Sequence, residues 1–124
     1  MLPCCVQMKR VLLVEDEKVI RTVLKILIEE IGHEVHEVDN GEKALAAVAE
    51  SEFDLILMDL HMPVMSGLKA MKKLRANNCQ ILTIAITASM TEEDKCKALE
   101  AGFDDCIVKD FNEQFNEHIE RFLR

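Results

Sequence analysis

The sequence predicts an α/β domain in which five parallel strands form one sheet and helices cover both of its faces. Short apolar runs alternate along the chain with segments whose apolar residues recur at helical spacing. The run at residues 55–58 is apolar at every position, which is typical of a strand buried on both faces. A carboxylate, Asp59, follows it directly. In open parallel sheets, ligands bind at that edge.

Apolar runs, most of them rich in β-branched residues, predict five strands. These strands are expected at residues 10–14, 34–38, 55–58, 81–86 and 106–108. Helical periodicity predicts five helices. They are expected at residues 17–31, 44–49, 68–76, from Thr91 to about 101, and from about 112 to 123. Gly32 and Gly102 suit helix C-termini, Thr91 suits an N-cap, and Asp39 with Glu42 is predicted to form a capping box.

Length and charge narrow the class of protein. A chain of 124 residues, of which 49% are hydrophobic and 31% charged, indicates one soluble globular domain. We expect a short N-terminal tail at residues 1–8 and a domain at 9–124. The formal net charge of −8 argues against nucleic acid or an anionic membrane as a partner. It suits a metal cation or a basic protein surface. No apolar run has the length of a membrane span.

The cysteines indicate a reducing compartment. Their number is odd, and none lies in a CxxC or Cys/His pattern with zinc spacing, so neither a disulfide scaffold nor a zinc site is favoured. A cytoplasmic location fits best. Cys106 is expected to be buried and inert, and His33, His36 and His118 are expected in solvent. The five cysteines are Cys4, Cys5, Cys79, Cys96 and Cys106.

Polar residues follow four of the predicted strands. They are Glu15 and Asp16 after the first, Asp59 after the third, Thr87 after the fourth and Lys109 after the fifth. A topological switch point would place the first and third strands side by side and gather the three carboxylates. Such carboxylates repel one another unless a cation joins them, and hard oxygen ligands indicate Mg²⁺, with Mn²⁺ as an alternative.

These five residues have the chemistry needed to transfer a phosphoryl group to an aspartate. Asp59 is the candidate nucleophile, and a divalent metal and Lys109 would balance charge on the phosphoryl oxygens. Thr87 offers a hydroxyl donor to the same oxygens. Each residue also has a structural interpretation: Asp59 or the Glu15–Asp16 pair as helix caps, Thr87 as a strand-end hydroxyl and Lys109 as a surface lysine.

The chain resembles the receiver domain of two-component response regulators, of the single-domain chemotaxis type. The resemblance covers about residues 9–124 and implies a flavodoxin-like, doubly wound sheet with strand order 2-1-3-4-5. It implies a signalling protein that passes its output to a separate partner and is expected to be a monomer. The matching motifs are VLLVEDE at 11–17, LMDLHMP at 57–63 with Gly67, ITA at 86–88 and VK at 108–109.

The resemblance also implies roles at the strand ends. Asp59 would accept a phosphoryl group from a phosphohistidine on a histidine kinase or histidine phosphotransfer protein, as in a phosphorelay. Asp16 and Asp59 would bind Mg²⁺ directly, Glu15 would bind it through water, and His61 would contribute its backbone carbonyl.

Thr87 would donate a hydrogen bond to the phosphoryl group, and Lys109 would pair with it. Receivers also catalyse hydrolysis of their own acyl phosphate, so the signal is self-limiting.

Three positions depart from the family pattern. Cys106 stands where an aromatic residue is common, Asp110 replaces the proline that usually follows the lysine, and Ser66 replaces an acidic residue. Cys106 and Asp110 motivate an alternative function, a degenerate receiver that is a constitutive protein-interaction module. A phosphatase of the haloacid dehalogenase type would need an aspartate where His61 stands. A flavin-binding domain would need a phosphate-cradling loop where Glu15 and Asp16 lie.

Overall fold

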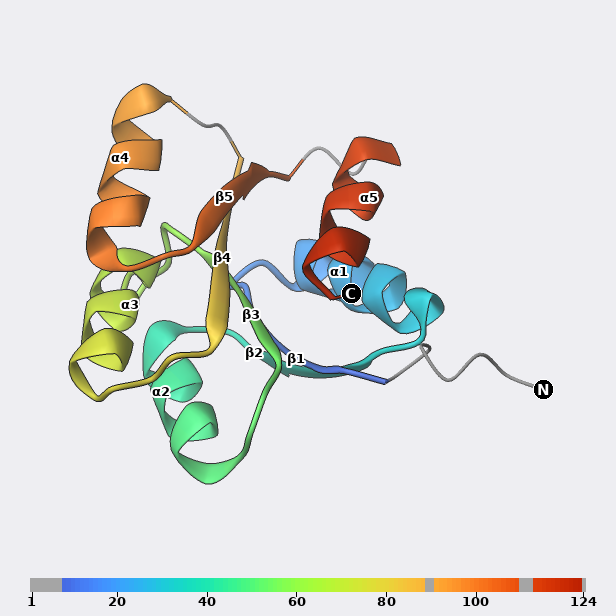
Figure 1. The fold of residues 1–124 in the computed structure, drawn as a ribbon, viewed down its shortest axis with the longest axis horizontal. Helices are drawn as coiled ribbons and strands as arrows, with labels where there is room; N and C mark the ends of the chain where they lie inside the picture. The colour runs from blue at the N-terminus through green and yellow to red at the C-terminus, as the bar shows by residue number, and fades with distance from the viewer. Residues whose placement is uncertain (1–7, 89–90, 110–112, 124) are drawn as a thin grey trace.

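The protein forms one parallel sheet with helices on both faces (Figure 1). The computed structural model describes residues 8–88, 91–109 and 113–123. The strands are β1 (Arg10–Val14), β2 (Glu34–Val38), β3 (Leu55–Asp59), β4 (Leu82–Thr87) and β5 (Asp105–Val108). The helices are α1 (Lys18–Ile31), α2 (Gly41–Glu50), α3 (Gly67–Ala76), α4 (Glu92–Ala101) and α5 (Glu113–Phe122). The order β2-β1-β3-β4-β5, with all neighbours parallel, confirms the predicted fold class.

The strand register brings four strand ends to one edge of the sheet. Val14 of β1 pairs with Met58 of β3, so Asp59 lies one residue beyond the last pair of these two strands. Asp59 pairs with Ile86 of β4, and Thr87 pairs with Val108 of β5. The chain moves outward in opposite directions from β1 and β3, which makes the junction of these two strands the topological switch point.

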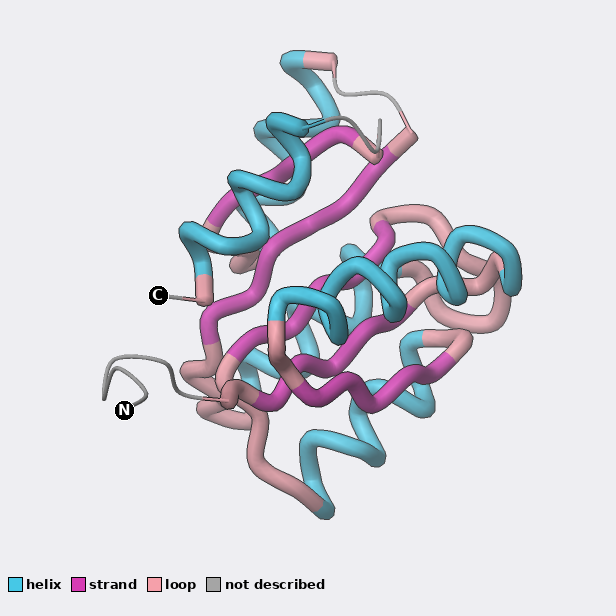
Figure 2. The backbone as a smooth tube through the Cα atoms, turned by 90° about the vertical axis from the view of Figure 1, so that its right-hand side faces the viewer, coloured by secondary structure: helices cyan, strands magenta, loops and turns pink. Residues whose placement is uncertain are grey.

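Alternate residues of the central strands pack into two separate cores. Leu12 and Ile56 face the side covered by α2, α3 and α4. Leu13 and Leu57 face the side covered by α1 and α5. All four side chains are fully buried, and each contributes roughly 1.5–3 kcal/mol of hydrophobic stabilisation. Figure 2 shows the strands between the two helical layers. The strand ends that carry the polar residues therefore stand on a rigid, doubly covered platform.

Helix ends mostly follow the sequence signals. Gly32 ends α1 with a φ of 107°, the left-handed conformation that favours glycine. Thr91 caps α4 by accepting a hydrogen bond from the Asp94 backbone N–H. Ser66, one of the departures from the family pattern, caps α3 by accepting a hydrogen bond from the Lys69 N–H.

The predicted capping box at Asp39 and Glu42 is wrong. Asn40 is the N-cap of α2, and its side chain accepts a hydrogen bond of 2.9 Å from the Lys43 N–H. Since the helix begins at Gly41 rather than at residue 44, the residue directly before it has the capping geometry. Asp39 instead forms an ion pair of 2.9 Å with the Lys43 ammonium group.

Arg75, at the end of α3, joins several segments at the edge of the sheet opposite to Asp59. Its guanidinium group donates to the backbone carbonyls of Gly102, Cys79 and Ile81 at 3.0, 2.8 and 3.1 Å. It also donates to the Asp104 carboxylate at 3.0 Å. These bonds fix the end of α3 against the end of α4 and the start of β4.

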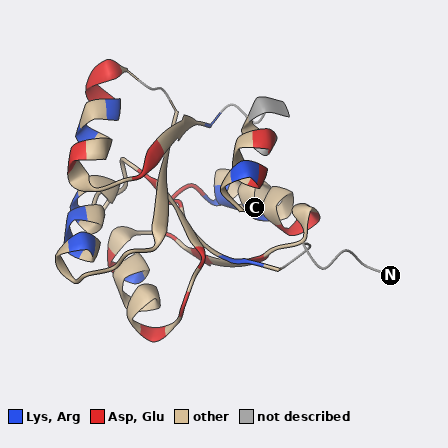
Figure 3. Ribbon diagram, in the orientation of Figure 1, with Lys and Arg blue, Asp and Glu red and all other residues tan. Residues whose placement is uncertain are grey.

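Charge is distributed unevenly despite the acidic total. Helix α3 carries three lysines and an arginine, whereas acidic residues occupy the first turn of α4 (Figure 3). Acidic side chains favour the positive end of the α4 dipole, and basic side chains favour the negative end of the α3 dipole. Within the described part of the chain, no helix is both long and apolar enough to cross a membrane.

Candidate functional site

The strand ends gather all five side chains that the sequence singled out. They line a cavity of about 300 Å³. The sequence argument depended only on which residues follow the apolar runs. Because the strands are parallel and in register, their carboxyl ends, and the residues that follow them, lie together at one edge of the sheet. The five residues are Glu15, Asp16, Asp59, Thr87 and Lys109. The cavity is also lined by Glu17, Ile20, His61, Ala88 and Asp94.

Three carboxylates form the centre of the site. One carboxylate oxygen each from Glu15, Asp16 and Asp59 lie within 4.8 Å of one another. Glu15 is fully buried and Asp59 is 6% exposed, so water screens their repulsion poorly. A set of hard oxygen donors at this spacing fits Mg²⁺, which binds carboxylates while keeping several waters. The residues present therefore fit the metal that the sequence predicts.

Lys109 lies between two of these carboxylates. Its ammonium group is 2.7 Å from Glu15 Oε1 and 3.1 Å from Asp59 Oδ2, and its side chain is 7% exposed. The Lys109 backbone N–H donates to the Thr87 carbonyl at 2.8 Å, which fixes the start of the loop after β5. Thr87 is itself buried. One ammonium group facing three carboxylates leaves an excess of negative charge.

The pKa values of Glu15 and Lys109 are both raised, for different physical reasons. Burial raises the pKa of Glu15 and the charge of Asp59 raises it further, while hydrogen bonds from Lys109 and the Glu17 N–H only partly offset this. Burial by itself would lower the pKa of Lys109. The hydrogen bond to Glu15 and the charges of Asp59 and Glu15 outweigh that effect, so the pKa of Lys109 is raised. Lys109 is therefore a firmly held cation.

A tight turn after β3 orients Asp59. The His61 N–H donates to Asp59 Oδ1 at 3.2 Å, and the Gly67 N–H donates to the Leu60 carbonyl at 2.9 Å. A Cβ atom on Gly67 would lie 1.9 Å from the Asp59 carbonyl oxygen, so only glycine fits there. The His61 side chain is exposed at the rim.

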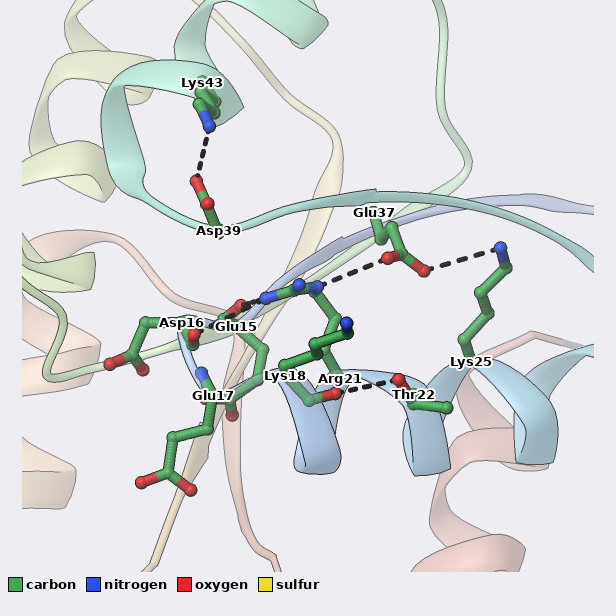
Figure 4. A network of polar contacts seen from close by, with 10 residues as sticks. All are labelled: Glu15, Asp16, Glu17, Lys18, Arg21, Thr22, Lys25, Glu37, Asp39 and Lys43. Carbon is green, nitrogen blue, oxygen red and sulfur yellow. Dashed lines mark hydrogen bonds and ion pairs between the residues drawn. The ribbon is translucent and has the colours of Figure 1, made fainter.

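Sequence reasoning gave no site role to two charged residues that lie in or near the cavity. Asp94, in the first turn of α4, lines the cavity, although the sequence argument treated it only as a charge favourable to its helix. Arg21, on α1, donates to the backbone carbonyls of the loop that carries Glu15 and Asp16 (Figure 4). The only available signal for Arg21 was its position shortly after two acidic residues at the start of a helix.

Two of the departures from the family pattern, Cys106 and Ser66, do not line the cavity. Cys106, in β5, is 5% exposed, as expected, and burial raises the pKa of its thiol. A thiol with a raised pKa is a weak nucleophile. The peptide bond between Lys109 and Asp110 lies outside the described residues.

Comparison with known proteins identifies this arrangement. The response regulator receiver domain family matches residues 11–119. The chain belongs to this family. It is therefore a receiver domain of the kind found in two-component systems.

Three known proteins illustrate the likeness. The transcriptional regulatory protein SrrA of Staphylococcus aureus is 38% identical over 102 residues, which are 82% of this chain and 42% of SrrA. The receiver domain thus spans about two fifths of that curated relative. TrrA of Thermotoga maritima, solved in complex with Mg²⁺ and BeF, is 33% identical with a TM-score of 0.83, over 93% of this chain and 99% of TrrA. The receiver domain of Ssk1 of Saccharomyces cerevisiae was solved with the histidine phosphotransfer protein Ypd1. It is 30% identical with a TM-score of 0.82, over 89% of this chain and 84% of the Ssk1 chain.

Proposed function

We propose that this receiver domain accepts a phosphoryl group on Asp59 from a phosphohistidine, in a reaction that depends on Mg²⁺ or Mn²⁺. The observation that carries the proposal is the group of three carboxylates within 4.8 Å, with Lys109 held between two of them. A purely structural domain gains nothing from gathering buried charges that repel one another. TrrA, a relative of the same fold, was solved with Mg²⁺ and BeF.

In the proposed reaction an Asp59 carboxylate oxygen attacks phosphorus, the phosphorus–nitrogen bond to the donor histidine breaks, and the imidazole nitrogen takes a proton. Asp16 and Asp59 would hold the metal directly and Glu15 through water, with the His61 carbonyl as a further ligand. Bound Mg²⁺ would neutralise charge on the phosphoryl oxygens.

Lys109 is already 3.1 Å from Asp59, so it would follow the negative charge onto the phosphoryl group. Thr87, at the buried end of β4, would donate its hydroxyl to the same oxygens. Hydrolysis would reverse the signal: water attacks phosphorus, the bond to Asp59 breaks, and inorganic phosphate leaves with the carboxylate restored.

An exposed apolar stripe on α1 supports a protein phosphodonor. Val19, Val23 and Ile26 are 75%, 38% and 49% exposed and lie on one side of the helix, at spacings of four and three residues. The helix begins directly after the acidic loop, so this stripe extends away from the site. Exposed apolar patches of this kind mark protein interaction surfaces. A histidine kinase or a phosphotransfer protein such as the Ypd1 bound by Ssk1 would dock there.

A second candidate function follows from Cys106. Because a small thiol stands where receivers commonly have an aromatic residue, phosphorylation would have no large side chain to move inward. The domain would then be a constitutive interaction module that keeps the fold without switching. In either case we propose a cytoplasmic location.

Intact-protein mass after incubation with acetyl phosphate and Mg²⁺ tests the proposal. We expect one phosphoryl adduct on the parent, and none on Asp59→Asn or without metal. If the small donor gives no adduct, the same measurement with a phosphorylated histidine protein separates a strict donor requirement from absent chemistry. No adduct from either donor would favour the interaction module.

A further inference from the structure

We propose that Arg21 is a positioning residue for the metal site, because it holds the backbone of the loop from which Glu15 and Asp16 extend into the cavity. The inference rests on the proposed function at this site and adds to it a residue outside the predicted ligand set. Arg21 does not line the cavity. It would act through the direction that it gives to the carboxylates.

The contacts of Arg21 are to backbone oxygens of the acidic loop (Figure 4). Its Nη1 donates to the Glu15 carbonyl at 2.9 Å and reaches the Asp16 carbonyl at 3.5 Å. The Arg21 side chain is 15% exposed, so these bonds are largely shielded from water. The side chains of the same two residues line the cavity.

Asp16 depends on this arrangement more than Glu15 does. The Glu15 carboxylate is held directly by Lys109 at 2.7 Å and by the Glu17 N–H at 3.1 Å. In the part of the chain that the structure describes, the Asp16 carboxylate makes no hydrogen bond or ion pair. Its direction is therefore set by its backbone, and the Arg21 contact is the one that reaches its carbonyl among the described residues.

The Glu37 carboxylate holds the guanidinium group itself in place. Arg21 Nε lies 3.3 Å from Glu37 Oε1 on β2, and Lys25 Nζ lies 3.4 Å from the other Glu37 oxygen. The loop is also tied to β2 through the Glu15 N–H, which donates to the Val38 carbonyl at 3.1 Å. Arg21 thus links the acidic loop to a fixed point on the sheet, in the way that outer-shell groups orient metal ligands.

The sign of the effect on metal affinity separates positioning from simple electrostatics. Arg21 is a cation near a cation site, so removing its charge alone would tighten Mg²⁺ binding. Removing a group that orients Asp16 would weaken it. Loss of an outer-shell group typically costs 10–100-fold in metal affinity, and we expect about tenfold for Arg21→Met.

Mg²⁺ titration by calorimetry, with the free energy of unfolding measured by circular dichroism in urea, tests this inference. Lys25→Met is the matched control for charge, because it removes a cation from the same ion-pair cluster without touching the loop carbonyls. Arg75→Met is the control for lost stability, since Arg75 also binds backbone carbonyls but at the far edge of the sheet. Circular dichroism is used because the chain has no tryptophan or tyrosine.

Weaker Mg²⁺ binding in Arg21→Met, with unchanged or tighter binding in Lys25→Met and unchanged binding in Arg75→Met, would support the inference. A folded Arg21→Met that binds Mg²⁺ as well as the parent would overturn it and leave the proposed function intact. If Arg21→Met does not fold, Arg21→Lys serves instead, because it keeps the charge but lacks the planar fork; parent-like affinity there overturns the inference. A parent that does not bind Mg²⁺ would overturn the proposed function and this inference together.

Discussion

Asp59 ends β3 directly after four consecutive buried apolar residues, so the chain places a charge at the end of an otherwise apolar strand. The whole of β3 is buried, and Asp59 itself is 6% exposed. Its charge is balanced by Lys109, yet Lys109 is shared with Glu15, and Asp16 adds a third carboxylate nearby. Without metal the site is therefore a source of instability that the two hydrophobic cores offset.

Replacing Asp59 with Asn should stabilise the metal-free protein by about 1–2 kcal/mol, because it removes one of three mutually repelling charges. The amide oxygen can still accept the hydrogen bond from the His61 N–H, whereas the bond from Lys109 to the other carboxylate oxygen is lost and Lys109 keeps its bond to Glu15. Urea unfolding of both proteins in chelator gives the comparison.

Saturating Mg²⁺ provides the complementary measurement. It should raise the free energy of unfolding of the parent by preferential binding to the folded state, and raise that of Asp59→Asn much less. A less stable Asp59→Asn in chelator, or an equal response of both proteins to Mg²⁺, would contradict this account of the site.

The grouping of these side chains at one edge of the sheet was predictable from the sequence, whereas the residues that support them were not. Glu15, Asp16 and Asp59 follow apolar runs directly, and a parallel sheet collects whatever follows its strands. Arg21 reaches the loop from one turn inside α1, and such a contact depends on the angle at which the helix leaves the strand. Asp94 is distant in sequence and reaches the cavity only through the placement of α4.

Among the elements, α2 shows how a sequence signal can be wrong by one residue. Asp39 and Asn40 are both good capping residues, and Glu42 completed a capping box only with Asp39. The side chain of Asn40 forms the cap, and Asp39 pairs with the end of Lys43. The choice depends on where the chain leaves β2, which periodicity cannot fix to a single residue.

The assignment of Asn40 as the N-cap of α2 leads to a prediction that compares two variants. Asn40→Ala should cost about 1 kcal/mol of unfolding free energy, because it leaves the Lys43 N–H without its partner. Asp39→Ala should cost clearly less, since it removes only exposed contacts: the ion pair with Lys43 and a hydrogen bond of 3.3 Å from the Asn40 side chain. Urea unfolding of the two variants decides between these caps, and a larger loss in Asp39→Ala would restore the original assignment.

Helix α1 was predicted from apolar residues on more sides than the core can cover. Leu24 and Ile28 are buried, whereas Val19 and Val23 are exposed. Sequence periodicity identifies the helix but does not say which of its apolar positions face the sheet. The exposed stripe became visible only when the sheet was in place.

This stripe supports a prediction about phosphotransfer. Val19→Gln with Val23→Gln removes apolar surface without changing charge, and should slow transfer from a phosphorylated histidine protein about tenfold or more. Labelling by acetyl phosphate should be unchanged, because the reacting groups are intact. Leu99→Gln on α4, also an exposed apolar residue, is the matched control and should leave both rates unchanged. Equal loss with both donors would place the defect in the site instead.

In the whole molecule, the carboxylate cluster and the hydrogen bonds that hold the loops in place lie at opposite edges of the sheet. The carboxylate cluster lies at the carboxyl edge of the sheet, and the opposite edge is held by Arg75 and by a bond of 3.0 Å between the Lys9 backbone N–H and His33 Nδ1. His33 was expected in solvent, and this prediction is wrong because its ring accepts that bond and is half-buried. The acceptor nitrogen must be unprotonated, so the fold favours neutral His33.

This bond should make folding stability depend on pH below neutrality. Burial lowers the pKa of His33, and the positive charge of Lys9 lowers it further, while Asp54 acts in the opposite direction. The contribution of neutral His33 to the free energy of unfolding is fully present above the ordinary histidine pKa of about 6.5. It is lost as pH falls from there through the lower pKa of the folded state, because the unfolded chain binds the proton first. Unfolding in urea between pH 7.5 and 5 should therefore show a decline that is shallower in His33→Asn, whose amide oxygen accepts the bond without titrating. Lys9→Met should also reduce the decline, since it removes one cause of the lowered pKa; a parent-like decline in His33→Asn would mean that other groups cause it.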